Sequence, residues 1–530
     1  MSFVSFKFLG FITAVILLYF IVPKKYRWVE LLIASYVFYY LCSKQLVLVH
    51  LGTTLWTFFI GKQIGNILQN GKTYLTEHKA EMDAVSRKAY KAVYKTKAKR
   101  LMFLGIFTDL AVLLFMKYFN FFGSLVNPIL IDTGHSTIPV LNLLLPLGIS
   151  FYTLQAMAYL IDIYREKIAP DTNPLKFMLF MAYFPQLTQG PIPRHKQLAS
   201  QLYEGHDFSY ERLCNGLQLM LWGYFQKIVI ADRAAIPVNT IFGSIGSYHG
   251  MQVFFAAALY GLQIYADFNG GMDIIRGFSQ ILGIELELNF QQPYFAQSVE
   301  EFWRRWHITL GSWMRDYVFY PLSLSKAFVS LSRNSRKLLG NYVGKKLPSF
   351  LSMFVVYLLV GFWHGAGTNY IAYGLWNGAF IMSSILLEAA YARLKDLLGI
   401  DENLLFWQIF RMIRTFIILS VGRIFTKMPT AESGMTVIRS IGNQLRDLSF
   451  LSSLKNLGID DRNWTVLLVA TLVLFLVDFL HEKNVHIREN VAKQHIIFRW
   501  SLYYLAIIVI LVFGIYGPAY NASEFIYQGF

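Results

Sequence analysis

Residues 350–387 read FLSMFVVYLLVGFWHGAGTNYIAYGLWNGAFIMSSILL. Two apolar runs, Phe350–Trp363 and Ile371–Leu387, are separated here by a short glycine-containing break that opens with His364. A helix needs about 20 residues to cross roughly 30 Å of hydrocarbon, so runs of this kind predict membrane helices whose ends are extended by less apolar turns. The imidazole of His364 is then expected at or within membrane depth.

Apolar runs of this kind continue through the whole chain of 530 residues. Hydrophobic residues make up 55% of it and charged residues only 15%, whereas soluble domains carry about 25% charged residues. We therefore predict an all-α polytopic membrane protein, with roughly 10–13 transmembrane or re-entrant helices in one integral membrane domain over residues 1–530. The thirteen apolar runs are Ser5–Val22, Trp28–Leu41, Leu46–Ile60, Leu101–Met116, Leu141–Ile163, Phe177–Leu187, Leu217–Ile230, Val253–Tyr265, Phe350–Trp363, Ile371–Leu387, Leu405–Val421, Trp464–Leu480 and Leu502–Ile515.

Some of these runs are too short to cross a bilayer alone. Phe177–Leu187 is an example, and we expect such segments to be re-entrant and central, because non-helical backbone at membrane depth must be covered by protein or line a water-filled cavity. The two cysteines, Cys42 and Cys214, both lie in apolar stretches. The sequence therefore offers neither a disulfide framework nor a cysteine metal site, and we predict no metal ligands.

Charge predicts the orientation, because basic loops of a membrane protein are held on the cytoplasmic side. The net charge is +16, and residues 72–100 carry nine basic and three acidic residues in a helical, Ala-rich stretch. We place this segment in the cytoplasm, together with the acid-free basic loop at 325–346 and with residues 481–499. The tail after Tyr516 has no Lys or Arg and is expected outside. The basic segments would bind anionic lipid head groups, and we expect no nucleic acid partner.

The least lipid-like part of the chain is its middle, residues 263–322. Polar residues are costly near a bilayer and are kept where a cavity or a reaction needs them. Asp267 and Asn269 follow an apolar run and precede Gly270 and Gly271, so we expect a glycine-rich break in a helix here. The alternative interpretation is that these polar side chains only cap and pack a helix.

Residues 300–307 read EEFWRRWH and place acids, paired arginines and two tryptophans within two helical turns. Trp and Arg favour the headgroup level, so Arg304, Arg305 and Trp306 fit either a structural interfacial belt or a binding surface. His307 closes this segment. A neutral histidine accepts a proton near pH 7, as general-base activation of a hydroxyl or thiol requires, which makes His307 and His364 the candidate catalytic residues.

The motifs that the chain lacks narrow the reaction class. There is no Gly-x-Ser-x-Gly elbow, Walker loop or His-Glu-x-x-His motif. Two histidines without a nucleotide or metal motif suit group transfer from a donor that is already activated. A thioester is the natural donor.

Several stretches resemble the membrane-bound O-acyltransferase (MBOAT) family. Within it they look like the bacterial AlgI/DltB-like branch, and the length of the chain favours the alginate O-acetyltransferase (AlgI) type. The resemblance covers nearly the whole chain, including YRWVELLIASYVFYYL near the start and the closing FIYQGF. Its main stretches are LLPLGISFYTLQAMAYLIDIYR (144–165), MAYFPQLTQGPIPR (181–194), GYFQKIVIADR (223–233), NFQQPYFAQSVEEFWRRWHITLGSWMRDYVFYPL (289–322) and GFWHGAGTNYIAYGLWNG (361–378).

The resemblance implies many helices around a central funnel or tunnel, with the catalytic motifs in a core over residues 144–378. It implies that His364, in the Trp-His-Gly match, is the catalytic histidine and that His307 is the second. We expect the substrate-binding or cavity-lining residues to be Trp363, Trp306, Arg304, Arg305, Asp267, Asn269 and Asn289.

The implied activity is transfer of an acyl group, acetyl in the first place, from a cytoplasmic thioester across the membrane to a cell-surface polysaccharide or cell-wall polymer. Acetyl-CoA or an acyl-carrier thioester would be the donor, with no bound cofactor. An extracytoplasmic acyltransferase with a serine nucleophile would be the partner, in a bacterial plasma membrane. D-alanyl transfer to teichoic acid, acylation of a lipid, and a transporter or channel remain alternatives.

Overall fold

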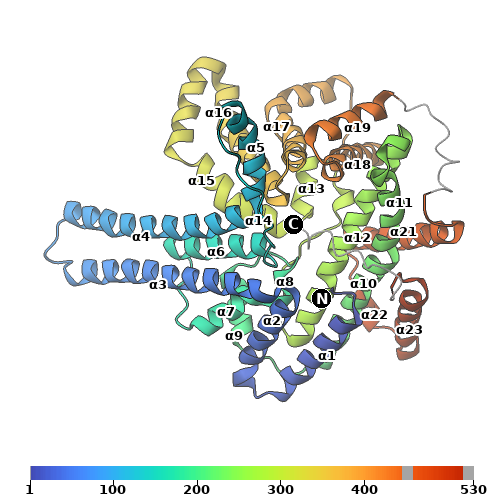
Figure 1. The fold of residues 1–530 in the computed structure, drawn as a ribbon, viewed down its shortest axis with the longest axis horizontal. Coiled ribbons are helices and arrows are strands. Elements are labelled where there is room, and N and C mark those ends of the chain that lie inside the picture. Colours follow the sequence, from blue (N-terminus) through green and yellow to red (C-terminus); the bar gives the residue numbers. More distant parts are fainter. Residues whose placement is uncertain (1, 444–456, 517–530) are drawn as a thin grey trace. The chain divides into compact units, whose positions relative to one another are not determined.

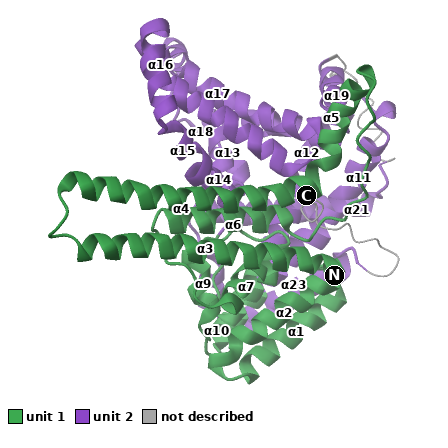
Figure 2. Ribbon diagram, turned by 60° about the vertical axis from the view of Figure 1, so that its left-hand side comes forward, with its two compact units in different colours: residues 1–217, 275–287 green, residues 218–274, 288–530 purple. Residues whose placement is uncertain are grey.

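The computed structural model describes residues 2–443 and 457–516. Helices dominate these residues, and no β-strand is formed among them apart from one isolated bridge. The chain divides into two compact units, shown in Figure 2: residues 1–217 with 275–287, and residues 218–274 with 288–530. The all-α class is confirmed. The tail after Tyr516, with its expected location and its family-like ending, lies outside the described residues.

Seven helical stretches in the described part of the chain are long and apolar enough to cross a membrane. The shorter helix Phe6–Ile21 is also apolar. The protein is therefore a multi-pass membrane protein, while the side on which each loop lies stays a prediction. The seven stretches are Lys24–Glu77, Ala84–Asp132, Lys326–His364, Thr368–Leu397, Leu405–Lys427, Asp461–Glu482 and Ile496–Phe513.

The first unit holds the N-terminal helices (Figure 1). The predicted apolar run Leu141–Ile163 becomes helical only at Ile149, and Phe177–Leu187 is split between two short helices, so it does not span as one element. The helices are α1 Phe6–Ile21, α2 Arg27–Ser43, α3 Val47–Glu77, α4 Ala84–Leu113, α5 Phe119–Asp132, α6 Ile149–Tyr164, α7 Pro174–Ala182, α8 Phe184–Leu187, α9 His195–Tyr203 and α10 Tyr210–Tyr224, whose end belongs to the second unit.

The basic segment 72–100 forms the tip of a hairpin of α3 and α4, which run side by side in Figures 1 and 2. Asp83 starts α4 by accepting a hydrogen bond from the backbone N–H of Ser86 at 2.8 Å. Glu166 pairs with both Lys72 and Lys95 and so ties the two helices to the residues after α6. The helical prediction for this segment is confirmed.

The second unit contains the candidate catalytic motifs. Its helices are α11 Asp232–Gly243, α12 Met251–Leu282, whose end belongs to the first unit, α13 Val299–Arg305, α14 Ile308–Met314, α15 Tyr320–Ser323, α16 Lys326–His364, α17 Thr368–Leu397, α18 Leu405–Lys427, α19 Ala431–Asn443, α21 Asp461–Glu482, α22 Ile487–Ala492 and α23 Ile496–Phe513, with π-helical turns at Phe225–Ala231 and Arg315–Phe319.

The prediction of a basic loop at 325–346 is wrong, because this segment is helical. Ser325 caps the N-terminus of α16 by accepting from the backbone N–H of Phe328 at 3.3 Å. Only Gly340 leaves helical geometry, at φ 79°, and divides α16 into two helical parts. Lys, Arg and Leu have high helix propensity, so a basic composition without acidic residues does not by itself indicate a loop.

The predicted break at Gly270 and Gly271 is also wrong, since α12 continues through both residues. The glycines serve close packing instead of a turn. A Cβ on Gly270 would lie 2.7 Å from the carbonyl oxygen of Gly223, and a Cβ on Gly223 would lie 2.5 Å from that of Gly270. The two backbones therefore touch where both residues lack a side chain.

Helices α16 and α17 pack against each other in the same way. A Cβ on Gly374 would lie 2.3 Å from the carbonyl oxygen of Tyr357 and 2.9 Å from the Cα of Gly361. We expect Gly374→Ala to destabilise the protein by about 1–3 kcal/mol, because the two helices must separate. Thermal unfolding in detergent measures this. Gly10→Ala in α1 is the control, since no atom of residues 2–443 and 457–516 lies within 4 Å of its Cβ position. Equal stability of both variants would contradict the packing argument.

Candidate active site

His364 is the last residue of α16. The chain leaves the helix at Gly365 and enters α17 at Thr368, so the break predicted at this motif is confirmed. A Cβ on Gly365 would lie 2.2 Å from a ring carbon of Tyr370, so only glycine lets that ring pack beside the end of α16. His364 is 4% exposed, and its ring contacts Trp363 and Tyr373 at centroid distances of 5.1 and 5.7 Å.

His307 lies between α13 and α14 and is 1% exposed. Its backbone is left-handed, at φ 47° and ψ 52°, which costs free energy for a non-glycine residue and persists only where the surroundings enforce it. Its ring meets Phe268 edge-on at 5.0 Å and Trp363 at 5.4 Å. Trp363 thus contacts both His307 and His364, and the structure brings the two predicted histidines together in one unit.

Asn289 orients His307. Its side-chain oxygen accepts from the N–H of Thr309 at 3.0 Å, from the Thr309 hydroxyl at 2.9 Å and from His307 Nδ1 at 3.3 Å. Because this oxygen accepts, Nδ1 carries the proton, and the lone pair of the neutral imidazole is on Nε2. His307 lies outside the seven candidate spans, and burial, followed by the charge of His364, lowers its pKa well below the usual 6.5. It is therefore neutral at pH 7.

The predicted residues Arg304, Arg305 and Trp306, at the end of the short helix α13, differ in their burial. Trp306 is buried and stacks on Phe302 at 5.3 Å. Arg304 is exposed and pairs with Glu300 one helical turn earlier, at 3.0 Å. Trp306 therefore joins the buried aromatic residues around His307, to which Trp363 also belongs, whereas Arg304 does not.

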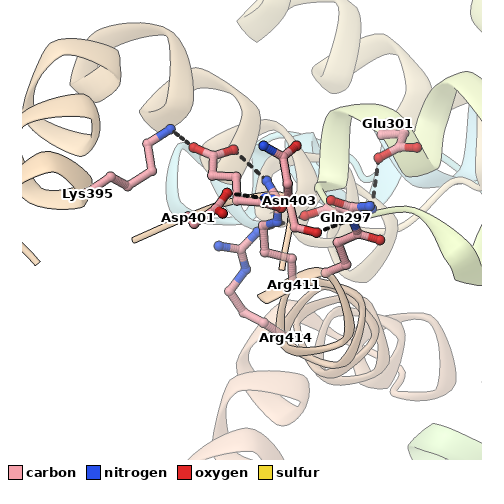
Figure 3. Close-up of polar contacts among 9 residues, drawn as sticks. Gln297, Glu301, Lys395, Asp401, Asn403, Arg411 and Arg414 are labelled. Carbon is pink, nitrogen blue, oxygen red and sulfur yellow. Dashed lines mark hydrogen bonds and ion pairs between the residues drawn. The ribbon is translucent and has the colours of Figure 1, made fainter. Parts of the chain in front are cut away.

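Arg305 takes part in an ion network. It pairs with Glu301 at 2.8 Å and with Glu482 of α21 at 2.6 Å. Figure 3 shows the neighbouring contacts, in which Glu301 accepts from the backbone N–H of Gln297 and Arg414 donates to the Gln297 carbonyl at 2.9 Å. This arrangement fastens α13 to α18 and α21.

Asp267 and Asn269 lie on α12 on either side of Phe268, the residue whose ring meets His307. Asp267 accepts from Lys227 at 2.6 Å, and Asn269 donates to Gln226 at 2.9 Å. Both partners lie in the π-helical turn Phe225–Ala231. Their hydrogen bonds hold this turn against α12.

Sequence reasoning missed three residues of this region. Lys227 is a charged residue within an apolar run, which is a signal that could have singled it out. Phe268 and Tyr373, whose rings meet the two histidines, look like ordinary apolar residues in the sequence and carry no such signal.

Comparison with known proteins decides the family. Residues 105–335 match the family described as membrane-bound O-acyltransferase, MBOAT. A probable alginate O-acetylase AlgI from Pseudomonas syringae pv. tomato is 31% identical over 406 residues, which are 76% of this chain and 68% of the relative. The chain belongs to the membrane-bound O-acyltransferase family. The earlier resemblance is confirmed, and the protein is an acyltransferase.

Two further relatives of this acyltransferase differ in what their names describe. A peptidoglycan O-acetyltransferase from Helicobacter pylori is 31% identical over 404 residues, 71% of this chain and 69% of the relative. A teichoic acid D-alanyltransferase from Streptococcus thermophilus is 28% identical over 263 residues, 48% of this chain and 60% of the relative. The family match at 105–335 includes His307 and ends before His364.

Proposed function

We propose that this acyltransferase moves an acetyl group from a cytoplasmic thioester to a cell-surface polysaccharide or cell-wall polymer, with His364 as the general base. One observation carries the proposal: His364 and His307 are both buried against Trp363, inside a multi-pass membrane protein of an O-acyltransferase family. Burying an ionisable side chain in a membrane protein costs free energy, so such residues usually have a function.

The proposed step needs one proton carrier. His364 takes the proton of the acceptor hydroxyl while its oxygen attacks the thioester carbonyl carbon, which forms the new C–O bond. The tetrahedral intermediate collapses, the C–S bond breaks, and the proton passes from the imidazolium to the departing sulfur. Protons and charge then balance, and His364 returns to its neutral form. His307, held by Asn289, would orient the donor or the acceptor.

Further components of the proposal concern partners and location. The donor is acetyl-CoA, whose phosphates would be attracted to the basic segment 72–100. An extracytoplasmic acyltransferase with a serine nucleophile would receive the acetyl group and acylate the polymer. The names of the AlgI and peptidoglycan relatives support a bacterial plasma membrane and a polymer acceptor.

A direct test compares two donors in membrane vesicles that hold the wild-type protein. We expect radiolabel from acetyl-CoA to be transferred, and label from a D-alanyl carrier protein to be ignored. Both donors are activated thioesters. The comparison therefore tests which acyl group and which carrier the protein accepts. Vesicles without the protein measure the background.

The second candidate function is D-alanyl transfer, which the similarity to the teichoic acid D-alanyltransferase favours. Label taken only from the D-alanyl carrier protein would replace the acetyl proposal with this one. Labelled lipid as the end product would indicate acylation within the membrane instead.

A further inference from the structure

Arg423 is a buried cation in α18, within one of the seven candidate spans. It is 3% exposed, and no carboxylate lies within ion-pair distance of it among the described residues. Its Nη2 donates to the hydroxyl of Tyr294 at 3.1 Å, while Nη1 is buried and has no hydrogen-bond partner in the part of the chain that the structure describes. A buried charge without a counter-ion is costly, and inside a membrane span it indicates a function.

Aromatic rings replace the missing counter-ion. The guanidinium carbon lies 5.4 Å from the ring centroid of Tyr294, 5.7 Å from that of Phe302 and 5.8 Å from that of Trp306. Each ring face attracts a cation, and the attraction grows when water is excluded. Three elements of the second unit therefore meet at one guanidinium: α18, α13 and the turn at Pro293–Phe295.

The opposite side of the guanidinium rests on α12. A Cβ on Gly261 would lie only 2.4 Å from Arg423 Nη1, so this position admits the guanidinium only as glycine. Tyr294 completes the seat by donating from its hydroxyl to the Gly261 carbonyl at 2.6 Å. We call Arg423, Gly261, Tyr294, Phe302 and Trp306 the Arg423 cluster.

The Arg423 cluster is connected to His307 through the backbone. Trp306 directly precedes His307 and pairs with Phe290 in the isolated β-bridge. On either side of that bridge, Gln291 N–H donates to the Arg305 carbonyl at 2.9 Å and Ile308 N–H donates to the Asn289 carbonyl at 3.0 Å. Fixing the Trp306 ring therefore fixes the strained, left-handed backbone from which the His307 ring projects.

We propose that Arg423 is a positioning residue for His307, acting through Trp306. This inference rests on the proposed function, which assigns His307 a part in the reaction. A lysine cannot replace the arginine, because a planar guanidinium stacks on several ring faces and reaches Tyr294 at the same time, whereas an ammonium is a compact point charge.

The test is a double-mutant cycle on acetyl transfer. Arg423→Lys is expected to lower kcat about 10- to 100-fold with KM nearly unchanged, as a small misplacement of a catalytic group does. In the His307→Ala background the same substitution is expected to have no further effect. Gly261→Ala should reproduce the loss, because its Cβ would displace Nη1. Arg393→Lys, on the exposed end of α17, is the matched control and should behave as wild type.

Three results would overturn the inference. These are an unchanged kcat in Arg423→Lys, an equal fold loss in both backgrounds, and unchanged hydrogen exchange at the amides of residues 306–308 in Arg423→Lys. The exchange measurement needs no substrate, so it separates this inference from the proposed function. A wild-type protein that transfers no acetyl group while Arg423→Lys loosens these amides would refute the function and leave the positioning role standing.

Discussion

His364→Gln should reduce acyl transfer by about 10²–10⁴-fold while the protein remains folded, because general-base catalysis contributes a factor of that size. Glutamine keeps much of the volume and polarity of histidine, so the packing against Trp363 and Tyr373 is largely retained. It cannot take up a proton at neutral pH. The loss should therefore appear in kcat, with little change in KM for the donor.

Transfer of labelled acetyl from acetyl-CoA, in vesicles adjusted to equal amounts of folded protein, measures this effect. His249→Gln is the matched control, because His249 belongs to the same unit and lies exposed in the turn before α12. Its backbone N–H donates to the Gln252 side chain and its carbonyl accepts from the Gln252 N–H, both at 3.0 Å, and the substitution leaves both bonds in place. His364→Ala should lose at least as much activity as the glutamine variant. Undiminished transfer in a folded His364→Gln protein would remove this residue from the mechanism.

His364 could be singled out from the sequence because the signal that marks it is local. An ionisable residue that ends an apolar run is expensive in a membrane, and the run of residues 350–363 is visible without knowledge of any partner. The helical tip of the α3 and α4 hairpin was predictable for the same reason, since its alanine-rich composition favours a helix by itself.

The features that the sequence did not reveal depend on distant partners. Gly270 lies in α12 without breaking it because Gly223, 47 positions earlier, meets its backbone. Nothing near Gly270 in the sequence distinguishes this contact from a turn. The residues that contact the Arg423 guanidinium likewise come from three other elements: Gly261 from α12, Tyr294 from the turn at Pro293–Phe295, and the other two rings from α13 and its C-terminal end. These contacts form only when the helices pack, and a single sequence does not indicate which helix faces contact each other.

Lys227→Met should destabilise the second unit by about 3–5 kcal/mol, the largest effect on stability that we expect. Lys227 is fully buried, and its Nζ lies 2.6 Å from Asp267 and 2.9 Å from Asp232, whose side chains are also buried. Methionine fills a similar volume but removes the cation with which both carboxylates pair. Two buried negative charges would then remain together without it. Thermal unfolding in detergent, at a pH where carboxyl groups are ionised, measures the loss.

A triple variant separates the charge effect from packing. Lys227→Met combined with Asp232→Asn and Asp267→Asn removes all three charges at nearly constant volume, and replacing a whole buried ion cluster is often neutral or stabilising. We therefore expect the triple variant to recover most of the stability that Lys227→Met loses. If it is as unstable as the single variant, packing of the lysine stem, and not its charge, holds the π-helical turn Phe225–Ala231 on α12. If Lys227→Met is as stable as wild type, the ion cluster contributes nothing to the fold.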